Sequence, residues 1–114
     1  MKTIFEYRKG VLFIRLFGVL TKETSNDFEL EINNIIKENG LTNVVLNIEK
    51  ISNIDQKGIH LLYYIYELSR KNNGKSLICN IPNENIRRKL KRKRLLNYVK
   101  EIDNELRAFE LIKI

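Results

Sequence analysis

The sequence contains one cysteine, one proline, one histidine and no tryptophan among its 114 residues. The lone Cys79 excludes an intramolecular disulfide and is typical of a reducing compartment. No metal or cofactor site is expected, because one Cys and one His cannot form a Cys/His cluster. No apolar run approaches the ~20 residues that cross a bilayer. The start, Met1–Glu6, carries an acid where a signal peptide needs an apolar region. We therefore expect a cytoplasmic protein without a membrane segment.

Recognisable catalytic patterns are also missing. The sequence has no nucleophile–base pair, no paired carboxylates at a useful spacing and no glycine-rich phosphate loop. His60, the one histidine, has no Ser, Cys or acid at a catalytic spacing and is expected to face solvent on a helix. The sequence therefore favours a protein that is not an enzyme, and it offers no catalytic residue.

Positive charge is concentrated in one short run, although the net charge is +7. Outside this run, the 14 remaining basic residues balance the 14 acidic ones. The run can be the solvated face of a helix, a surface that neutralises nucleic-acid phosphates, or a contact for an acidic protein. No aromatic residue is interleaved in it, which argues against a platform that stacks single-stranded bases. Its members are Arg87, Arg88, Lys89, Lys91, Arg92, Lys93 and Arg94.

Short β-rich runs alternate with amphipathic helical patterns along the chain. The predicted strands are 4–7, 11–17 (ended by Gly18), 44–48, 76–79 and 99–102. The predicted helices follow Thr21, Asp55, Asn83 and Asp103, with the first three ending near residues 40, 74 and 93. This order predicts one α/β domain over residues 1–114. Its sheet is expected to be mixed but mostly parallel, with four to five strands and helices packed against it.

The segment Ile54-Asp55-Gln56-Lys57-Gly58-Ile59 is the most informative part of the chain. It follows the apolar strand Val44–Ile48 through a short loop and opens a helix, so it presents backbone N–H groups at a sheet edge. Asp55 is expected to accept an N–H of the first turn, and Gly58 to lie where helix and sheet pack closely. Lys57 opposes the helix dipole by about 0.3–1 kcal/mol.

The whole pattern resembles a STAS domain, the fold of bacterial anti-sigma factor antagonists. The resemblance includes the initial hairpin, the Gly18-Val19-Leu20 turn and the segment Asp55-x-x-Gly58. It continues through Gly74-Lys75-Ser76-Leu77 and the loop Asn80-Ile81-Pro82-Asn83 before a third helix. It implies a domain that binds a protein partner, an anti-sigma factor that is also a serine kinase, and thereby frees a sigma factor.

The resemblance also exposes one substitution. In that family the loop reads Asp-Ser-Ser-Gly or a Thr variant, and the kinase phosphorylates the second hydroxyl residue. Here Gln56 matches the first Ser, and Lys57 occupies the position of the phosphoacceptor. Ser52, upstream in the same region, is expected to be a turn residue.

We therefore predict a regulatory module, monomeric or weakly dimeric, that binds its partner through Asp55, Gln56, Lys57 and Gly58 without the usual switch. The alternative is a small nucleic-acid-binding protein that uses the run from Arg87 to Arg94.

Overall fold

A computed structural model describes residues 1–112 of the chain. Five strands form one sheet in the order β1-β2-β3-β4-β5, in which β1 is antiparallel to β2 and the other neighbours are parallel. This confirms the predicted α/β class, the mixed sheet and the order of elements. The strands are β1 (Lys2–Arg8), β2 (Val11–Leu20), β3 (Asn43–Ile54), β4 (Ser76–Cys79) and β5 (Lys100–Ile102).

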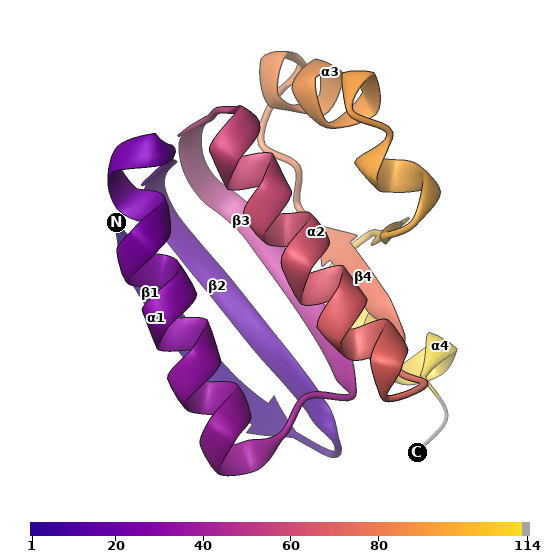
Figure 1. Ribbon diagram of the computed structural model, residues 1–114. Helices are drawn as coiled ribbons and strands as arrows, with labels where there is room; N and C mark the ends of the chain where they lie inside the picture. The colour runs from indigo at the N-terminus through magenta and orange to yellow at the C-terminus, as the bar shows by residue number, and fades with distance from the viewer. Residues whose placement is uncertain (113–114) are drawn as a thin grey trace.

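Up to residue 112, four α-helices and two short 3-10 helices connect or follow these strands. Figure 1 shows α1 and α2 side by side on one face of the sheet, with α3 beside the beginning of α2. Thr21 is the N-cap of α1, as predicted, and its N–H donates to Thr24 Oγ1 at 3.0 Å. The helical segments are α1 (Lys22–Asn39), α2 (Gln56–Lys71), α3 (Glu84–Arg92), η1 (Leu95–Asn97), η2 (Glu105–Arg107) and α4 (Ala108–Leu111).

The two central strands are longer than predicted. Gly18 does not end β2 but pairs with Ile51, and no loop follows Ile48, because β3 continues to Ile54. The pairing shifts register twice, and each shift adds one residue on the β3 side. Residues spaced by three, Ile48, Ile51 and Ile54, thereby all become buried. The alternation expected of a strand is lost, so the sequence pattern suggested a loop. Ser52 lies on β3 and is exposed, so its prediction as a turn residue was wrong.

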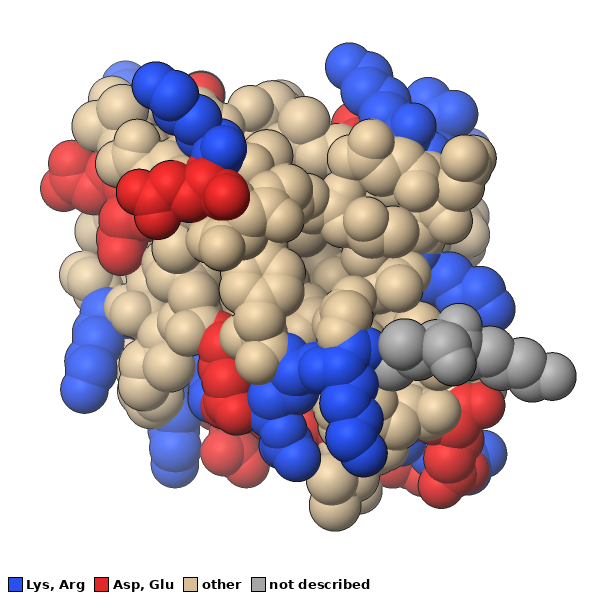
Figure 2. All heavy atoms as spheres, turned by 90° about the horizontal axis from the view of Figure 1, so that it is seen from below, with Lys and Arg blue, Asp and Glu red and all other residues tan. Residues whose placement is uncertain are grey.

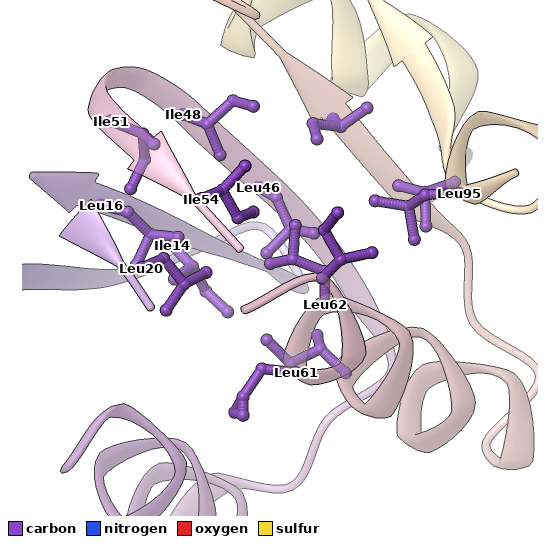
Figure 3. Packing of buried hydrophobic residues seen from close by; sticks show 14 of the residues in the cluster. Ile14, Leu16, Leu20, Leu46, Ile48, Ile51, Ile54, Leu61, Leu62 and Leu95 are labelled. Carbon is purple, nitrogen blue, oxygen red and sulfur yellow. The ribbon is translucent and has the colours of Figure 1, made fainter. Parts of the chain in front are cut away.

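The main core lies between the sheet and the pair α1 and α2. Phe28 and Ile32 of α1, four residues apart on one face of the helix, are buried there. Figure 3 shows Leu62 of α2 directed toward side chains of β2 and β3, including Ile54 and Leu20, and Leu61 belongs to the same buried cluster. This packing holds the ends of β2 and β3, and with them the start of α2, in fixed positions.

The C-terminal segment covers part of the other face of the sheet. Phe13, Val45 and Leu77 form a second buried cluster with Ala108 and Ile112. Arg15 donates twice to the Glu105 carboxylate, at 2.7 and 2.8 Å, and joins this segment to β2. The predicted helix cap Asp103 was wrong. Asn104 is the N-cap of η2, and its side chain accepts the Arg107 N–H at 3.2 Å. Asp and Asn cap equally well, so sequence alone did not separate them.

Residues 1–112 include no helix that combines the length and the apolar composition needed to cross a membrane. Within the same range, no three His, Cys, Asp or Glu side chains come together as a metal site. Cys79 is buried in β4, and burial raises the pKa of its thiol to about 12.

Candidate functional site

Two helices begin side by side at the ends of the parallel strands β2 and β3. Leu20 pairs with Ile54, so the caps Thr21 and Asp55 follow at the same edge of the sheet. Asp55 Oδ1 accepts the Gly58 N–H of α2 at 2.9 Å, and Oδ2 accepts the Lys22 N–H of α1 at 2.8 Å. One carboxylate therefore caps both helices, whereas only the bond within α2 was predicted.

The environment of Asp55 favours its ionised form. Burial by itself raises the pKa of the carboxyl, but the backbone N–H groups of Gly58 and Lys22 outweigh it and hold the pKa below its usual value. Both oxygens accept hydrogen bonds from backbone groups of the chain. Asp55 thus serves the architecture of the site, and its negative charge is already engaged with two helix N-termini.

Gly58 lies where α2 packs against the end of β2. A Cβ atom at this position would lie 2.2 Å from the Leu20 carbonyl oxygen and 2.9 Å from Leu20 Cγ. Such distances are far inside van der Waals contact, and the nearest obstacle is backbone that cannot rotate away. The predicted role of Gly58 as a packing glycine is therefore confirmed.

Gln56 and Lys57 lie between these two fixed residues, and both are exposed in the first turn of α2. Lys57 borders a shallow depression together with Lys22 and His60. His60 is exposed on the helix, as predicted. The position that the resemblance assigns to a phosphoacceptor thus presents a cation to solvent, with a second lysine beside it.

Helix α3 lies against the same end of the molecule. Lys89 Nζ donates to Asn53 Oδ1 at 2.9 Å and to the Ile54 carbonyl at 3.1 Å, which attaches α3 to the last residues of β3. Lys89 was predicted only as part of an exposed basic run. Its contacts bring two surfaces that sequence treated separately, the Asp55 segment and the basic run, into one region.

A groove separates the first turns of α2 from α3. It encloses about 350 Å³, and its residues include the buried Ile59, the exposed Gln56, and Arg92 and Lys93 from the end of α3. The remaining lining residues are Ile54, Asp55 and Lys89. Apolar side chains therefore meet basic ones in a hollow that adjoins the predicted site.

The basic run is divided by the structure. Arg87 is paired with the Glu101 carboxylate by two bonds of 2.7 and 2.8 Å. Lys89, Arg92 and Lys93 border the groove, while Arg88 and Lys91 are exposed without lining it. Arg94 follows α3 in a left-handed conformation, with φ of 60°. The run thus differs from the single patch that sequence suggested.

Sequence reasoning missed several members of this surface. The contribution of Lys22 follows from the Leu20–Ile54 register, which a pattern of parallel strands followed by caps could have indicated. The contacts of Asn53 with Lys89, and the position of Ile59 in the groove, depend on where α3 packs. No local signal in the sequence reports that position.

Comparison with known proteins relates the chain to one family. The model of the STAS domain family matches residues 3–108. The anti-sigma F factor antagonist of Paenibacillus polymyxa is 25% identical over 109 residues, 96% of this chain and 92% of the relative. The crystal structure of an anti-sigma factor antagonist from Mycobacterium paratuberculosis has a TM-score of 0.80 at 17% identity, covering 99% of this chain and 94% of that one. The Bacillus cell fate determinant SpoIIAA, in its phosphorylated form, has a TM-score of 0.73 at 20% identity, covering 98% and 100%.

The structural matches establish the fold, and the match to the family model shows to which family the chain belongs. None of these comparisons supports the nucleic-acid alternative. The chain belongs to the STAS domain family and resembles its anti-sigma factor antagonists.

Proposed function

We propose that the protein is a non-enzymatic regulator that binds an anti-sigma factor through the first turn of α2, and that residues 1–114 act as one domain. One observation carries the proposal. The fixed residues Asp55 and Gly58 hold Gln56 and Lys57 exposed between them, at an edge where two helices begin. Side chains that are presented by a rigid frame lose little entropy on binding, so they suit recognition.

The proposed contact is constitutive. Lysine has no hydroxyl to accept a phosphoryl group, and it retains a charge of +1 where a phosphorylated residue carries close to −2. The chain therefore binds its partner without being released by modification at residue 57. The partner surface opposite Lys57 is expected to carry negative charge.

The anti-sigma F factor of Paenibacillus polymyxa is a suitable probe, because the curated relative is named as its antagonist. We expect the purified chain to bind it in isothermal titration calorimetry, and Lys57→Glu to weaken that binding at least tenfold. The same variant should retain or slightly increase its thermal stability, since an acid in the first turn favours the helix dipole.

Lys71→Glu is the matched control, because it makes the same charge change at the other end of α2. Equal effects of the two substitutions would show that total charge, and not the α2 N-terminus, governs binding. Unchanged affinity of Lys57→Glu for the probe would show that this turn is not the interface.

Phosphorylation provides an independent test. Incubation with the anti-sigma factor and ATP should leave the intact mass unchanged, because the family position is Lys57. Ser52 is the nearest exposed hydroxyl on β3, and its Oγ lies 3.3 Å from the Gly18 carbonyl oxygen. A phosphate located at Ser52 by peptide mapping would contradict the loss of the switch.

A further inference from the structure

The groove beside α2 continues into an aromatic cluster. Tyr63 lies one helical turn beyond Ile59 on α2, so both side chains face the same side. The Tyr63 hydroxyl donates to the carbonyl of Lys93, which itself borders the groove, at 2.5 Å. The surface that begins at Gln56 therefore extends along α2 and is bounded by α3 and the segment after it.

Tyr98 occupies the far end of this surface. Its ring centroid lies 5.9 Å from that of Tyr63 and 5.6 Å from that of Tyr66, and its side chain is 54% exposed. An exposed tyrosine supported by two others is a rigid contact of the kind enriched at the centres of protein interfaces. The strip thus has basic side chains at one end and an aromatic side chain at the other.

The positive charges along the strip have no neutralising partner among the described residues. Within residues 1–112, no carboxylate lies within salt-bridge distance of Lys89, Arg92 or Lys93. The partners of Lys89 are an amide and a carbonyl oxygen, which leave its charge uncompensated. Asp55, the one acid in the groove, already accepts two backbone N–H groups. The opposite end of the molecule differs: Figure 2 shows acidic and basic side chains intermixed there around a large uncharged area.

We propose that this strip, Gln56 to Tyr98 between α2 and α3, is a docking groove for an acidic, partly apolar segment of a protein partner. The proposal rests on the proposed function, because the strip begins at the α2 turn assigned to the partner. Acidic side chains of the segment meet Arg92, Lys93 and Lys89, and its apolar side chains cover Ile59 and Tyr98.

Nucleic acid fits the strip less well. The lining of the groove includes the aliphatic side chains of Ile54 and Ile59, which have no hydrogen-bond donor or positive charge for a phosphate. Tyr63 and Tyr66 are half-buried and pack against Tyr98, so they do not present a row of free ring faces for base stacking. An acidic peptide uses both the apolar floor and the basic rim.

A synthetic peptide of about 16 residues, in which pairs of Glu and Leu alternate, tests the proposal on the full chain. Its Leu pairs recur every four residues, close to the helical period, so we expect it to bind as an amphipathic acidic helix that spans several turns of α2. In ¹⁵N-resolved NMR spectra we expect amide shifts to concentrate at Ile59, Arg92, Lys93 and Tyr98. A Lys-Leu peptide of the same pattern should produce none.

Helix α3 supplies its own matched controls. Arg92→Glu combined with Lys93→Glu should weaken binding of the acidic peptide at least tenfold. Arg88→Glu combined with Lys91→Glu changes the net charge equally on the same helix, outside the groove. This control should weaken peptide binding less than threefold.

The aromatic end of the strip is tested separately. Tyr98→Ala should weaken peptide binding about fivefold, whereas Leu106→Ala, at an exposed apolar residue away from the strip, should have no effect. Circular dichroism melting of each variant checks the fold.

Equal losses of peptide affinity in the two double variants would overturn the docking groove, because they would show that binding depends on the total charge of α3. Shifts spread evenly over Arg88 and Lys91, or no binding at millimolar peptide, would also overturn it. Tighter binding of a 16-nucleotide oligothymidylate than of the peptide, at equal salt, would assign the strip to nucleic acid. The peptide test does not involve the anti-sigma factor, so it can fail while the effect of Lys57→Glu on that protein persists, and the reverse also holds.

Discussion

Single residues at the start of α2 have separate tasks. Asp55 and Gly58 shape the turn, whereas Gln56 and Lys57 are exposed on it. The two classes are expected to respond differently to substitution, because the first pair shapes the fold and the second pair is the proposed contact with the partner.

Removal of the shared cap should destabilise two helices at once. Asp55→Ala is expected to lower the free energy of unfolding by about 2 kcal/mol, near the upper end of the range for one N-cap. The reason is that Lys22 N–H of α1 and Gly58 N–H of α2 both lose their acceptor. Urea unfolding measures the change. Gln56→Ala is the control and should cost less than about 0.5 kcal/mol; a similar loss in both variants would contradict a specific capping role.

The same carboxylate should make stability depend on pH. Its folded-state pKa lies below the ordinary value, so the folded chain binds the proton less readily than the unfolded chain. Its contribution is therefore fully present above about pH 4 and is lost as the pH falls through the lower folded-state pKa. We expect the stability difference between the native chain and Asp55→Asn to shrink between about pH 7 and pH 3. A constant difference would exclude ionisation of Asp55 as its source.

Gly58 admits no side chain. Gly58→Ala is expected to destabilise the chain by about 2–4 kcal/mol, as in severe overpacking, because the new Cβ would meet the Leu20 carbonyl. Thermal unfolding and the NMR spectrum of the variant would show it. A variant as stable as the native chain would mean that α2 can move away from β2 at no cost.

At the scale of elements, the C-terminal segment is joined to the sheet by the second buried cluster and by the ion pair of Glu105 with Arg15. Arg15 is the largest influence on Glu105 and holds the pKa of that carboxyl below its usual value, and Asn47 also donates to it at 2.8 Å. The Glu105 side chain is half-buried. Its removal would leave the positive charge of Arg15 less well neutralised.

Glu105→Ala should therefore cost about 1–3 kcal/mol, the range for hydrogen bonds to partly buried charged groups. Glu110→Ala removes an exposed pair with Arg107 two residues from the C-terminal end of the described chain, and should cost less than about 1 kcal/mol. Chemical denaturation compares the two. If both substitutions leave the free energy of unfolding unchanged, the stability of the C-terminal segment does not depend on the contact of Glu105 with Arg15.

Sequence patterns predicted the elements well where the period was regular. The helices that follow Thr21 and Asp55 lie where the patterns placed them. The patterns failed at Gly18 and beyond Ile48, because two register shifts change which residues of β3 face the core. They also could not report that Lys89 reaches the Ile54 carbonyl, since the docking of α3 is set by tertiary packing.

At the scale of the whole molecule, β3 lies at the centre of the sheet and β1 and β5 at its edges. The central strand pairs on both sides and is buried against α1 and α2. Amides of Val44–Ile48 should therefore exchange with solvent only through global unfolding, whereas those of β1 and β5 should exchange through smaller openings. Native-state hydrogen exchange tests this, and equal protection of β1 and β3 would contradict it.

Gln56 and Lys57 stand between two residues that cannot change without harm to the fold. Their own side chains touch little of the protein, so replacing them leaves the core, both helix caps and the sheet intact. Under the proposed function, partner preference can consequently be altered at these two positions independently of folding. A small library randomised at residues 56 and 57 alone would yield folded proteins throughout, and selection on it could redirect the scaffold to new binding partners.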